Sequence, residues 1–367
     1  MMYEPTEFAK ILTYTAVSFV IAIWWAPSLI RLLRWLRFWK KTKRKLNMSG
    51  DAYTDETLKK FYDKDESQVK IPRGGGLLIW INTLVFACFF WVLLKIEPSS
   101  KSFQYLNFIS RSQTFIPIGT LFFGSIFGFI DDALSTLESG GNYKAGGLKL
   151  SQRLTLITIL STLIGVWFYL RAEIYKITIF TYTIDLHNLF GHNFGWLIVP
   201  FTVFVLLILW GSSVIDGFDG LSGGTFVPIF LCFGAIAFTR GFYDIATLMS
   251  VIAASTMAFL WYNISPAKFY MGDTCSTGLL LTLGVVAIIL DATYILPIAG
   301  IMLFATVFSN IIQISSKKFL GRKVLRAAPL HHHFEALGLK RNQIVLRYWM
   351  ITIVMSALGL AIAILLR

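Results

Sequence analysis

The chain has 367 residues, of which 56% are hydrophobic and only 14% are charged, and its formal net charge is +13. Soluble domains carry about 25% charged residues, so the composition excludes an ordinary soluble protein and indicates a single integral-membrane domain over residues 1–367. The three cysteines lie in or beside apolar runs without a CxxC pair, which argues against a disulfide framework and against a structural zinc site.

Ten apolar segments are long enough to cross a membrane, since a helix of about 20 residues spans the hydrocarbon core. We therefore expect an all-α membrane protein, a polytopic bundle of about ten transmembrane helices. Between the fourth and fifth segments, residues near 172–194 alternate as in a short outer β-hairpin. In chain order the ten segments are 10–31, 74–94, 114–130, 154–171, 195–211, 222–239, 244–262, 276–291, 294–314 and 346–366.

The basic residues assign the two sides of the membrane. With the connection after the first segment in the cytoplasm, the cytoplasmic loops are about 32–73, 131–153, 211–221, 263–275 and 315–345. Counted with their flanking span ends, these loops hold 25 of the 33 Lys and Arg residues. This positive-inside pattern places both termini in the periplasm and explains the net charge without nucleic acid. The aromatic and basic run 31–45 also suits a helix end on anionic lipid headgroups, beside its role in topology.

Polar residues gather in five clusters in those cytoplasmic loops. The clusters come from distant parts of the chain, so their convergence on one face of the bundle makes either an active site or a transport vestibule. Taken singly, each also fits a structural role: a solvated helix end, a Gly-Asp turn, a helix cap or a surface loop. The clusters are "KIPRGGGLL" with Lys70, "FGFIDD" with Asp131 and Asp132, "DGFDGLSGG" with Asp216 and Asp219, "NISPAKFYMGD" with Asn263 and Asp273, and "HHH" at His331, His332 and His333.

This inventory suits phosphoryl transfer. Carboxylates without cysteine ligands or histidines at the i, i+4 spacing favour Mg²⁺, a hard cation that prefers oxygen. Glycine-rich loops let backbone N–H groups approach phosphate oxygens, and Lys, Arg and His side chains donate to them. A phosphoryl transition state needs mainly positioning and charge neutralisation. Consecutive histidines point in different directions on a helix, so they suit phosphate donation or proton transfer better than one shared metal.

"FGFIDD", "DGFDGLSGG", "NISPAKFYMGD" and "APLHHHFEALG", in this order, resemble the motifs of the polyprenyl-phosphate N-acetylhexosamine-1-phosphate transferase superfamily. "APLHHHFE" followed by "RNQIVLRYWMITIV" is similar to the phospho-N-acetylmuramoyl-pentapeptide transferase family. The resemblance implies a Mg²⁺-dependent enzyme of the bacterial inner membrane, usually a homodimer, with its active site in the cytoplasm. The implied reaction moves phospho-MurNAc-pentapeptide from UDP-MurNAc-pentapeptide to undecaprenyl phosphate, giving UMP and lipid I for peptidoglycan synthesis.

The resemblance also implies a role for each matching residue. Asp131, of the Asp131–Asp132 pair, is expected to hold or deprotonate the polyprenyl phosphate, whose oxygen attacks the β-phosphorus of the nucleotide sugar. Asp273 is expected to bind Mg²⁺, with Asp216 as a further catalytic and metal-binding acid. His331, His332 and His333 are expected to line the pocket and support the pyrophosphate or sugar. The expected substrate-binding residues are Lys70, Lys149, Arg153, Ser213, Gly217, Asp219, Asn263 and Tyr270, with Tyr270 where an aromatic side chain stacks on uracil.

The chain departs from the family pattern at several positions. Trp210, Ser213 and Ile215 stand where the family has asparagines and a threonine, and Cys275 replaces a glycine. "PRGGG" stands in place of "PTMGG". A lysine usually follows the aspartate pair closely but is missing here, and the candidates to replace it are Lys144, Lys149 and Arg153.

Three alternatives stay open. The motifs fit both direct displacement and an aspartyl intermediate, because a carboxylate serves as base or as nucleophile. A related transferase of GlcNAc-1-phosphate or a similar sugar phosphate would fit the altered asparagine positions, although the triple histidine argues against it. A transporter of anionic substrates would place ionisable groups near the middle of spans and show matching broken helices, whereas the acids here cluster at one face.

Overall fold

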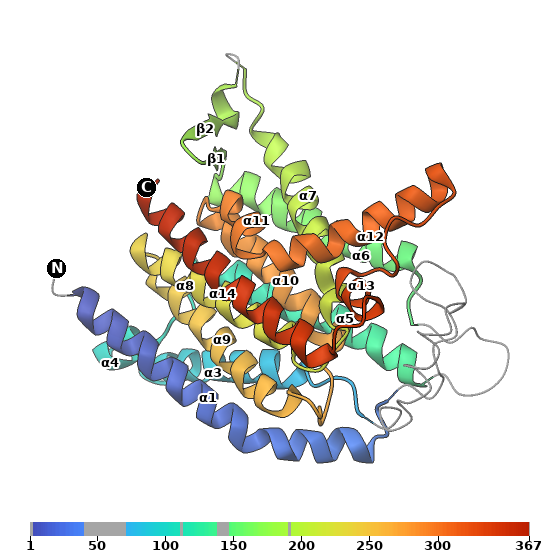
Figure 1. The fold of residues 1–367 in the computed structure, drawn as a ribbon. Coiled ribbons are helices and arrows are strands. Elements are labelled where there is room, and N and C mark those ends of the chain that lie inside the picture. Colours follow the sequence, from blue (N-terminus) through green and yellow to red (C-terminus); the bar gives the residue numbers. More distant parts are fainter. Residues whose placement is uncertain (1–2, 40–70, 111–112, 138–146, 190–191, 367) are drawn as a thin grey trace.

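The long apolar runs fold as helices, because a backbone in hydrocarbon must satisfy its hydrogen bonds within its own segment. The computed structural model describes residues 3–39, 71–110, 113–137, 147–189 and 192–366 (Figure 1). Its helices and strands are α1 (Tyr3–Trp35), α3 (Leu77–Ile96), α4 (Lys101–Leu106), α5 (Phe115–Leu137), α6 (Leu150–Trp167), β1 (Lys176–Ile179), β2 (Tyr182–Asp185), α7 (Ile198–Gly211), α8 (Leu221–Thr239), α9 (Tyr243–Asn263), α10 (Asp273–Ile289), α11 (Leu296–Ala299), α12 (Ile301–Leu320), α13 (Leu330–Ala336) and α14 (Arg341–Leu365).

Most of these helices have the length and composition of membrane spans. Among the described residues, eight are long and apolar enough to cross a membrane: α1, α3, α5, α6, α7 with its flanking turns, α8, α9 and α14. A ninth span results if α11 and α12, which bend by 83° around Gly300, cross together. The apolar α10 has 17 residues. The predicted class, a multi-pass helical membrane protein, is confirmed, and each of the ten predicted segments coincides with a helix or with the bent pair.

Besides shifts at other helix ends, the structure differs from the prediction in three segments. α5 runs past its expected end at 130 to Leu137, because neighbouring groups satisfy the carboxylates of its last turns inside the bundle. The expected span 294–314 is bent rather than straight, and α12 continues until Gly321 adopts a left-handed conformation that ends it. The expected loop 315–345 contains the short helix α13, which carries the three histidines.

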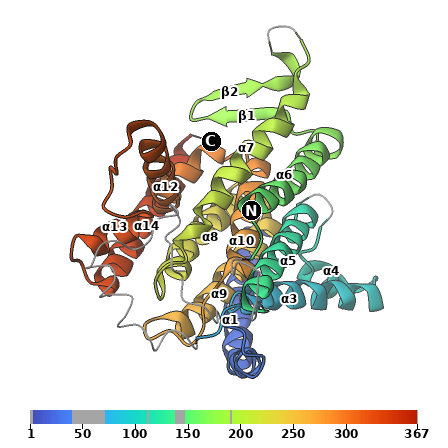
Figure 2. The same ribbon diagram turned by 90° about the vertical axis from the view of Figure 1, so that its right-hand side faces the viewer.

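The predicted hairpin near 172–194 is confirmed as the antiparallel pair β1–β2, with Lys176 opposite Asp185 and Ile179 opposite Tyr182. It stands out from the helices at the top of Figures 1 and 2. The Thr178 N–H donates to Asp291 Oδ1 over 2.8 Å, which anchors the hairpin to the turn after α10. The start of α1 and the end of α14 lie at the left of Figure 1 and α13 lies at the right, as an even number of crossings would arrange them. The assignment of these two ends of the bundle to the periplasm and to the cytoplasm stays a prediction.

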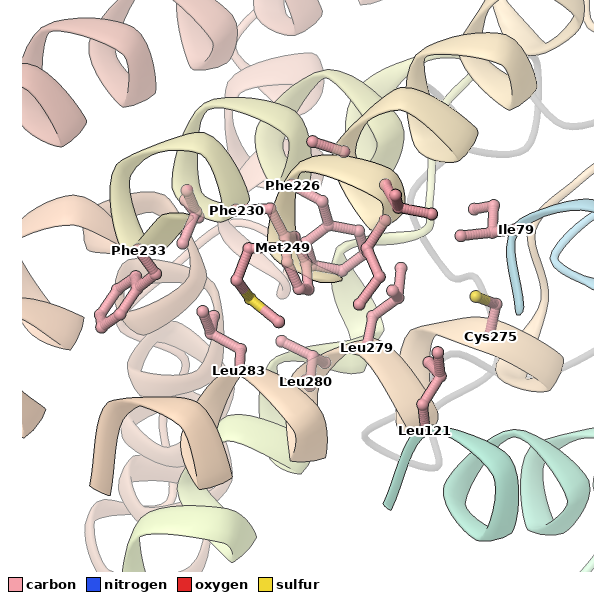
Figure 3. Packing of buried hydrophobic residues seen from close by; sticks show 14 of the residues in the cluster. Ile79, Leu121, Phe226, Phe230, Phe233, Met249, Cys275, Leu279, Leu280 and Leu283 are labelled. Atoms are coloured by element: carbon pink, nitrogen blue, oxygen red, sulfur yellow. The ribbon is translucent and has the colours of Figure 1, made fainter. Parts of the chain in front are cut away.

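The centre of the bundle is formed by α8, α9 and α10. In α8 and α9, 72% and 78% of the most apolar stretch is buried, against 28–44% in the other spans. Figure 3 shows how phenylalanines of α8 pack with Met249 of α9 and with leucines of α10. Around this centre, α1 packs against α9, α14 against α8, and α5 and α7 against α10. The central helices therefore give the bundle a rigid frame for the segments at its ends.

Glycines bring α5 and α10 unusually close together. A Cβ at Gly124 would lie 2.9 Å from the Cα of Gly278, and one at Gly128 would lie 1.7 Å from the carbonyl oxygen of Asp273. Small residues at a four-residue spacing let helix backbones approach in membranes, where packing replaces the hydrophobic effect as the force between helices. This contact sets the carboxyl-terminal turns of α5 beside the first turn of α10.

The Gly128→Ala variant tests this contact. Its methyl group would overlap the Asp273 carbonyl, and since a helix backbone cannot move aside locally, we expect a loss near or above the ~1–3 kcal/mol typical of overpacking. Gly119→Ala, on the same helix with open space at its Cβ position, is the matched control. Thermal unfolding in detergent should show a lower midpoint for Gly128→Ala alone, and equal midpoints would contradict the close contact.

Candidate active site

Two helix ends build an acidic centre. The last turns of α5 carry Asp131 and Asp132, and α10 begins at Asp273. Asp131 and Asp132 are 4% and 1% exposed, respectively. A carboxylate removed from water in this way is costly unless charges or hydrogen-bond donors compensate it. The structure supplies such partners from α6, from the start of α10 and from the segment before α3.

Asp132 acts as a cap for α10 from a different helix. Its Oδ2 accepts hydrogen bonds from the Thr274 N–H over 2.9 Å and from Thr274 Oγ1 over 2.7 Å. The first turn of a helix has unpaired N–H groups and a partial positive charge, so a carboxylate there is stabilised. The guanidinium of Arg73 lies 3.5 Å from the other oxygen of Asp132. Asp132 thereby ties together α5, α10 and the chain before α3.

Arg153, in the first turn of α6, bridges the other two acids. Its Nη2 lies 2.8 Å from Asp131 Oδ2, and its Nη1 lies 3.2 Å from Asp273 Oδ2. Asp131 also accepts a 2.7 Å hydrogen bond from the Leu148 N–H, and Arg153 Nε donates to the Leu148 carbonyl over 3.0 Å. One guanidinium thus neutralises two carboxylates and is itself held by the backbone at the start of α6. Of the two predicted replacements for the missing lysine that the structure describes, Lys149 and Arg153, it is Arg153 that contacts the aspartate pair.

A small pocket opens beside these charges. Asp131, Arg153 and Asp273 line its polar side, and its other side is largely apolar, with Phe127, Leu156, Ile157 and Trp210. Trp210 is one of the positions where the chain departs from the family pattern. The departure therefore lies in the lining of the same pocket as the acids and changes the wall of that pocket.

The glycine-rich loop between α7 and α8 adds a further acid next to α10. Asp216 Oδ1 accepts from Ser222 Oγ over 2.7 Å, and its Oδ2 accepts from the Gly272 N–H over 3.0 Å. Burial raises the pKa of Asp216, and these two hydrogen bonds oppose that rise. Gly272 immediately precedes Asp273, so Asp216 lies at the same helix start as the other acids.

The remainder of this loop is held by backbone contacts. Asp219 Oδ2 accepts from the Ala267 N–H over 3.1 Å. Asn263 is 1% exposed, accepts from the Gly220 N–H over 2.9 Å and donates to the Phe269 carbonyl over 2.9 Å. Gly220 has φ +78°, a conformation that favours glycine. These contacts give Asp219 and Asn263 a role in shaping the loop, while their predicted contact with substrate stays a prediction.

The segment 72–76 pairs with the chain that enters α10. The Tyr270 N–H donates to the Pro72 carbonyl over 2.9 Å, and the Gly75 N–H donates to the Tyr270 carbonyl over 2.7 Å. A Cβ at Gly76 would lie 2.3 Å from the Cβ of Cys275. Cys275, one of the departures from the family pattern, therefore packs against the end of the "PRGGG" stretch, at a glycine that the family pattern shares. This pairing also places Arg73 beside Asp132.

The three histidines have three different surroundings on α13. His331 is fully buried, its ring packs edge-on against Phe218 at 5.0 Å, and its Nε2 faces Gly217, where a Cβ would come within 2.3 Å of it. Burial and the neighbouring His332 lower the pKa of His331 well below 6.5, so His331 is neutral. His332 Nδ1 lies 3.0 Å from Glu335 Oε2, and the Arg326 N–H donates to His333 Nδ1 over 3.2 Å.

The structure brings most of the predicted site residues together. Asp131, Asp132, Arg153 and Asp273 form the acidic centre, with Asp216 at the same helix start and Gly217 against His331. The Ser213 carbonyl accepts from the Asp216 N–H over 3.3 Å, whereas Lys149 is exposed at the start of α6. Lys70 and Lys144 lie outside the described residues. The predictions missed Arg73, Thr274, Glu335 and Arg341, although each lies within or next to a stretch singled out for another residue.

The Mg²⁺ ion that the family resemblance implies stays a prediction, and the carboxylates of the acidic centre are of the donor type that it prefers. Among the described residues, no group of three or more His, Cys, Asp and Glu side chains is placed to hold a metal ion. Mg²⁺, however, usually keeps several waters and binds through one or two carboxylates together with substrate phosphates. Asp131 and Asp273 already direct one oxygen each at a shared cationic group. Asp273 belongs both to this pair and to the acids that the resemblance expects to bind Mg²⁺, and carboxylate oxygen is the ligand type that a hard ion prefers.

Together, these features are those of a multi-pass membrane enzyme that acts on phosphate-bearing substrates. Residues 114–291 match the model of glycosyl transferase family 4. Over 350 residues, the chain is 30% identical to a phospho-N-acetylmuramoyl-pentapeptide-transferase of Acetivibrio thermocellus, which covers 94% of this chain and 92% of that relative. A relative of the same name from Geobacillus thermodenitrificans is 28% identical over 95% of this chain and 96% of its own length. Another, from Methylacidiphilum infernorum, is 28% identical over 87% of this chain and 86% of its own length. The chain belongs to the phospho-N-acetylmuramoyl-pentapeptide-transferase family, which confirms the resemblance seen in its motifs.

The Thr274→Val variant tests the cap that Asp132 provides. Valine keeps the shape of threonine but removes the hydroxyl that donates to Asp132. Hydrogen bonds to charged groups contribute about 1.5–3 kcal/mol, so we expect a clear drop in the unfolding midpoint. Thr282→Val on the same helix loses only a hydrogen bond to the Gly278 carbonyl and should cost less. A drop no larger than that of Thr282→Val would show that the Thr274 hydroxyl does not stabilise Asp132.

Proposed function

We propose that the protein transfers phospho-MurNAc-pentapeptide from UDP-MurNAc-pentapeptide to undecaprenyl phosphate, releasing UMP and forming lipid I. The observation that carries this proposal is the similarity, over 94% of the chain, to a relative named for this transfer. The acidic centre supports it, because its acids and arginines lie where a charged sugar nucleotide and a lipid phosphate could meet. Lipid I would then enter peptidoglycan synthesis and serve growth of the cell wall, cell shape and division.

The proposed setting is the bacterial inner membrane, with ten crossings, both termini periplasmic and the active site cytoplasmic. The excess of Lys and Arg in alternate connections supports this orientation. A nucleotide sugar is too large and too charged to leave the cytoplasm, whereas the lipid phosphate reaches the site laterally within the membrane. A homodimer, the usual state implied by the resemblance, is part of the same proposal.

Asp273 and Asp216 are the proposed Mg²⁺ ligands, and Asp131 faces Asp273 across Arg153. When bound, Mg²⁺ would neutralise charge on the pyrophosphate as the bond to UMP breaks. Asp216 is held toward the start of α10 by the Gly272 N–H, and Asp273 shares the guanidinium of Arg153 with Asp131. These contacts keep the acids of three segments at one place before substrate arrives.

The remaining roles fall to the chain's own side chains. Asp131 would hold or deprotonate the lipid phosphate, whose oxygen then attacks the β-phosphorus of the nucleotide sugar. Arg153 and Arg73 would donate to phosphate oxygens, because guanidinium groups match the geometry of phosphate. The apolar side of the pocket, with Leu156 and Ile157, excludes water near Asp131 and strengthens these interactions.

Substrate choice is tested by UMP release from the purified protein in detergent with polyprenyl phosphate and Mg²⁺. UDP-MurNAc-pentapeptide and UDP-GlcNAc are offered separately, and we expect turnover with the first alone. Turnover with UDP-GlcNAc alone would favour the related GlcNAc-1-phosphate transferase, the candidate that the altered pocket wall at Trp210 supports. Folded protein that turns over neither and binds neither would favour a transporter of anionic substrates.

Asp273→Ala should abolish Mg²⁺-dependent turnover. Loss of one group that stabilises the transition state typically costs about 10²–10³ in rate, so we expect a loss of at least about a hundredfold at saturating substrates. Asp185→Asn, in the hairpin, is the control, since asparagine caps a helix as well as aspartate does. Near-normal turnover of Asp273→Ala at ordinary Mg²⁺ concentrations would remove Asp273 from the metal site.

A further inference from the structure

Two neighbouring histidines on α13 meet opposite kinds of hydrogen-bond partner. His332 Nδ1 lies 3.0 Å from a carboxylate oxygen of Glu335. His333 Nδ1 lies 3.2 Å from the backbone N–H of Arg326. In a neutral imidazole one nitrogen donates and the other accepts, and the partner of one nitrogen decides the state of the other. The protonation of each ring is therefore readable from its Nδ1 contact.

The carboxylate of Glu335 can only accept hydrogen bonds and cannot donate one. Its side chain is 1% exposed, and its Oε1 lies 2.7 Å from Arg341 Nε. Burial opposes its ionisation, but hydrogen bonds and charge from His332 and Arg341 outweigh that effect and hold the pKa of Glu335 below its usual range. An ionised carboxylate has no hydrogen to give. His332 must therefore carry a hydrogen on Nδ1, which leaves Nε2 unprotonated in the neutral ring.

His333 is in the reverse state. The Arg326 N–H is a donor, so the Nδ1 that receives it carries no hydrogen. Neutral His333 consequently has its hydrogen on Nε2. Two consecutive and chemically identical side chains, His332 and His333, are therefore held in opposite tautomers by what surrounds them.

Arg341 does more than neutralise Glu335. Its guanidinium lies 5.4 Å from the ring centre of Phe218, and the His332 ring meets the same phenylalanine edge-on at 5.1 Å. Phe218 lies between Gly217 and Asp219 in the glycine-rich loop. Arg341 and His332, which both bind Glu335, thus contact the same residue of that loop, and this places His332 against the segment that carries Asp216.

We infer that Glu335 and Arg341 are positioning residues that lock His332 as a hydrogen-bond acceptor at Nε2, beside His333 as a donor at Nε2. An acceptor at His332 suits a hydroxyl or amide N–H and a donor at His333 suits a phosphate oxygen, and a phosphorylated N-acetyl amino sugar carries both kinds of group. The match to substrate rests on the proposed function, whereas the protonation states do not.

The Glu335→Gln variant gives the sharpest test. Arg341 can only donate, so the glutamine carbonyl must face Arg341 and its NH₂ group must face His332. The NH₂ group donates to Nδ1, and His332 is forced into the opposite tautomer. The same logic explains why an amide in place of a carboxylate beside a catalytic histidine leaves it with the wrong tautomer.

The tautomers are measured by long-range ¹⁵N–¹H NMR of the histidine-labelled full chain, with His332→Gln and His333→Gln to assign the signals. In the wild type at a pH where the rings are neutral, we expect His332 protonated at Nδ1 and His333 protonated at Nε2. In Glu335→Gln we expect the His332 signals to reverse and those of His333 to stay. Wild-type rings in the same tautomer, or an unreversed His332 in Glu335→Gln, would overturn the inference.

Turnover supplies the second readout. We expect Glu335→Gln to lower kcat by about 10–100-fold, the usual effect of losing a group that orients a functional histidine, with little change in the KM for the nucleotide sugar. Arg341→Lys keeps a donor against Glu335 and should keep the wild-type tautomer. Arg347→Gln removes an equal charge from an exposed position of α14 and is the matched control. Reversed tautomers with unchanged kcat would overturn the positioning role, and an inactive wild type with the expected tautomers would reject the proposed function alone.

Discussion

The close contact between α5 and α10 is the constraint on which the candidate site depends. Glycines at 124, 128 and 278 let the two backbones touch, and this approach brings Asp132 within reach of the unpaired donors at the start of α10. A wider separation would leave a buried carboxylate without donors, which is strongly unfavourable. Helix packing and charge compensation therefore stabilise each other. Asp131 comes to lie beside Asp273 as a result of both.

Each acid of the centre is compensated in a different way. Asp132 is compensated by the start of α10 and by Arg73. Asp131 and Asp273 share the guanidinium of Arg153. Asp216, at the same helix start, accepts hydrogen bonds from Ser222 and from a backbone N–H. In surroundings of low polarity such fixed partners interact more strongly than they would in water. They are also in place before a substrate arrives, so little reorganisation is needed when charge moves during phosphoryl transfer. The enclosed bundle centre provides the rigid frame that this arrangement requires.

The spans could be predicted because each is a continuous apolar run in the sequence. The hairpin could be predicted because apolar and polar residues alternate locally near 172–194. The end of α5 could not be predicted, since hydropathy falls at Asp131 while the helix continues through contacts with α6 and α10. The bend between α11 and α12 is likewise invisible in an apolar run. Partners of the predicted acids were the hardest to foresee. The basic residue that meets Asp131 could not be chosen from spacing alone, because only the packed fold shows that Arg153 faces it and Lys149 does not.

The contact between Gly76 and Cys275 links side-chain size to electrostatics. Position 275 holds a small thiol only because position 76 has no side chain, so the two residues share one fixed volume. Segment 72–76 also carries Arg73, whose guanidinium compensates Asp132. A bulkier residue at 275 would push this segment outward and draw the arginine away from its carboxylate. A position without charge would thus act as a spacer that tunes the strength of an ion pair in the acidic centre.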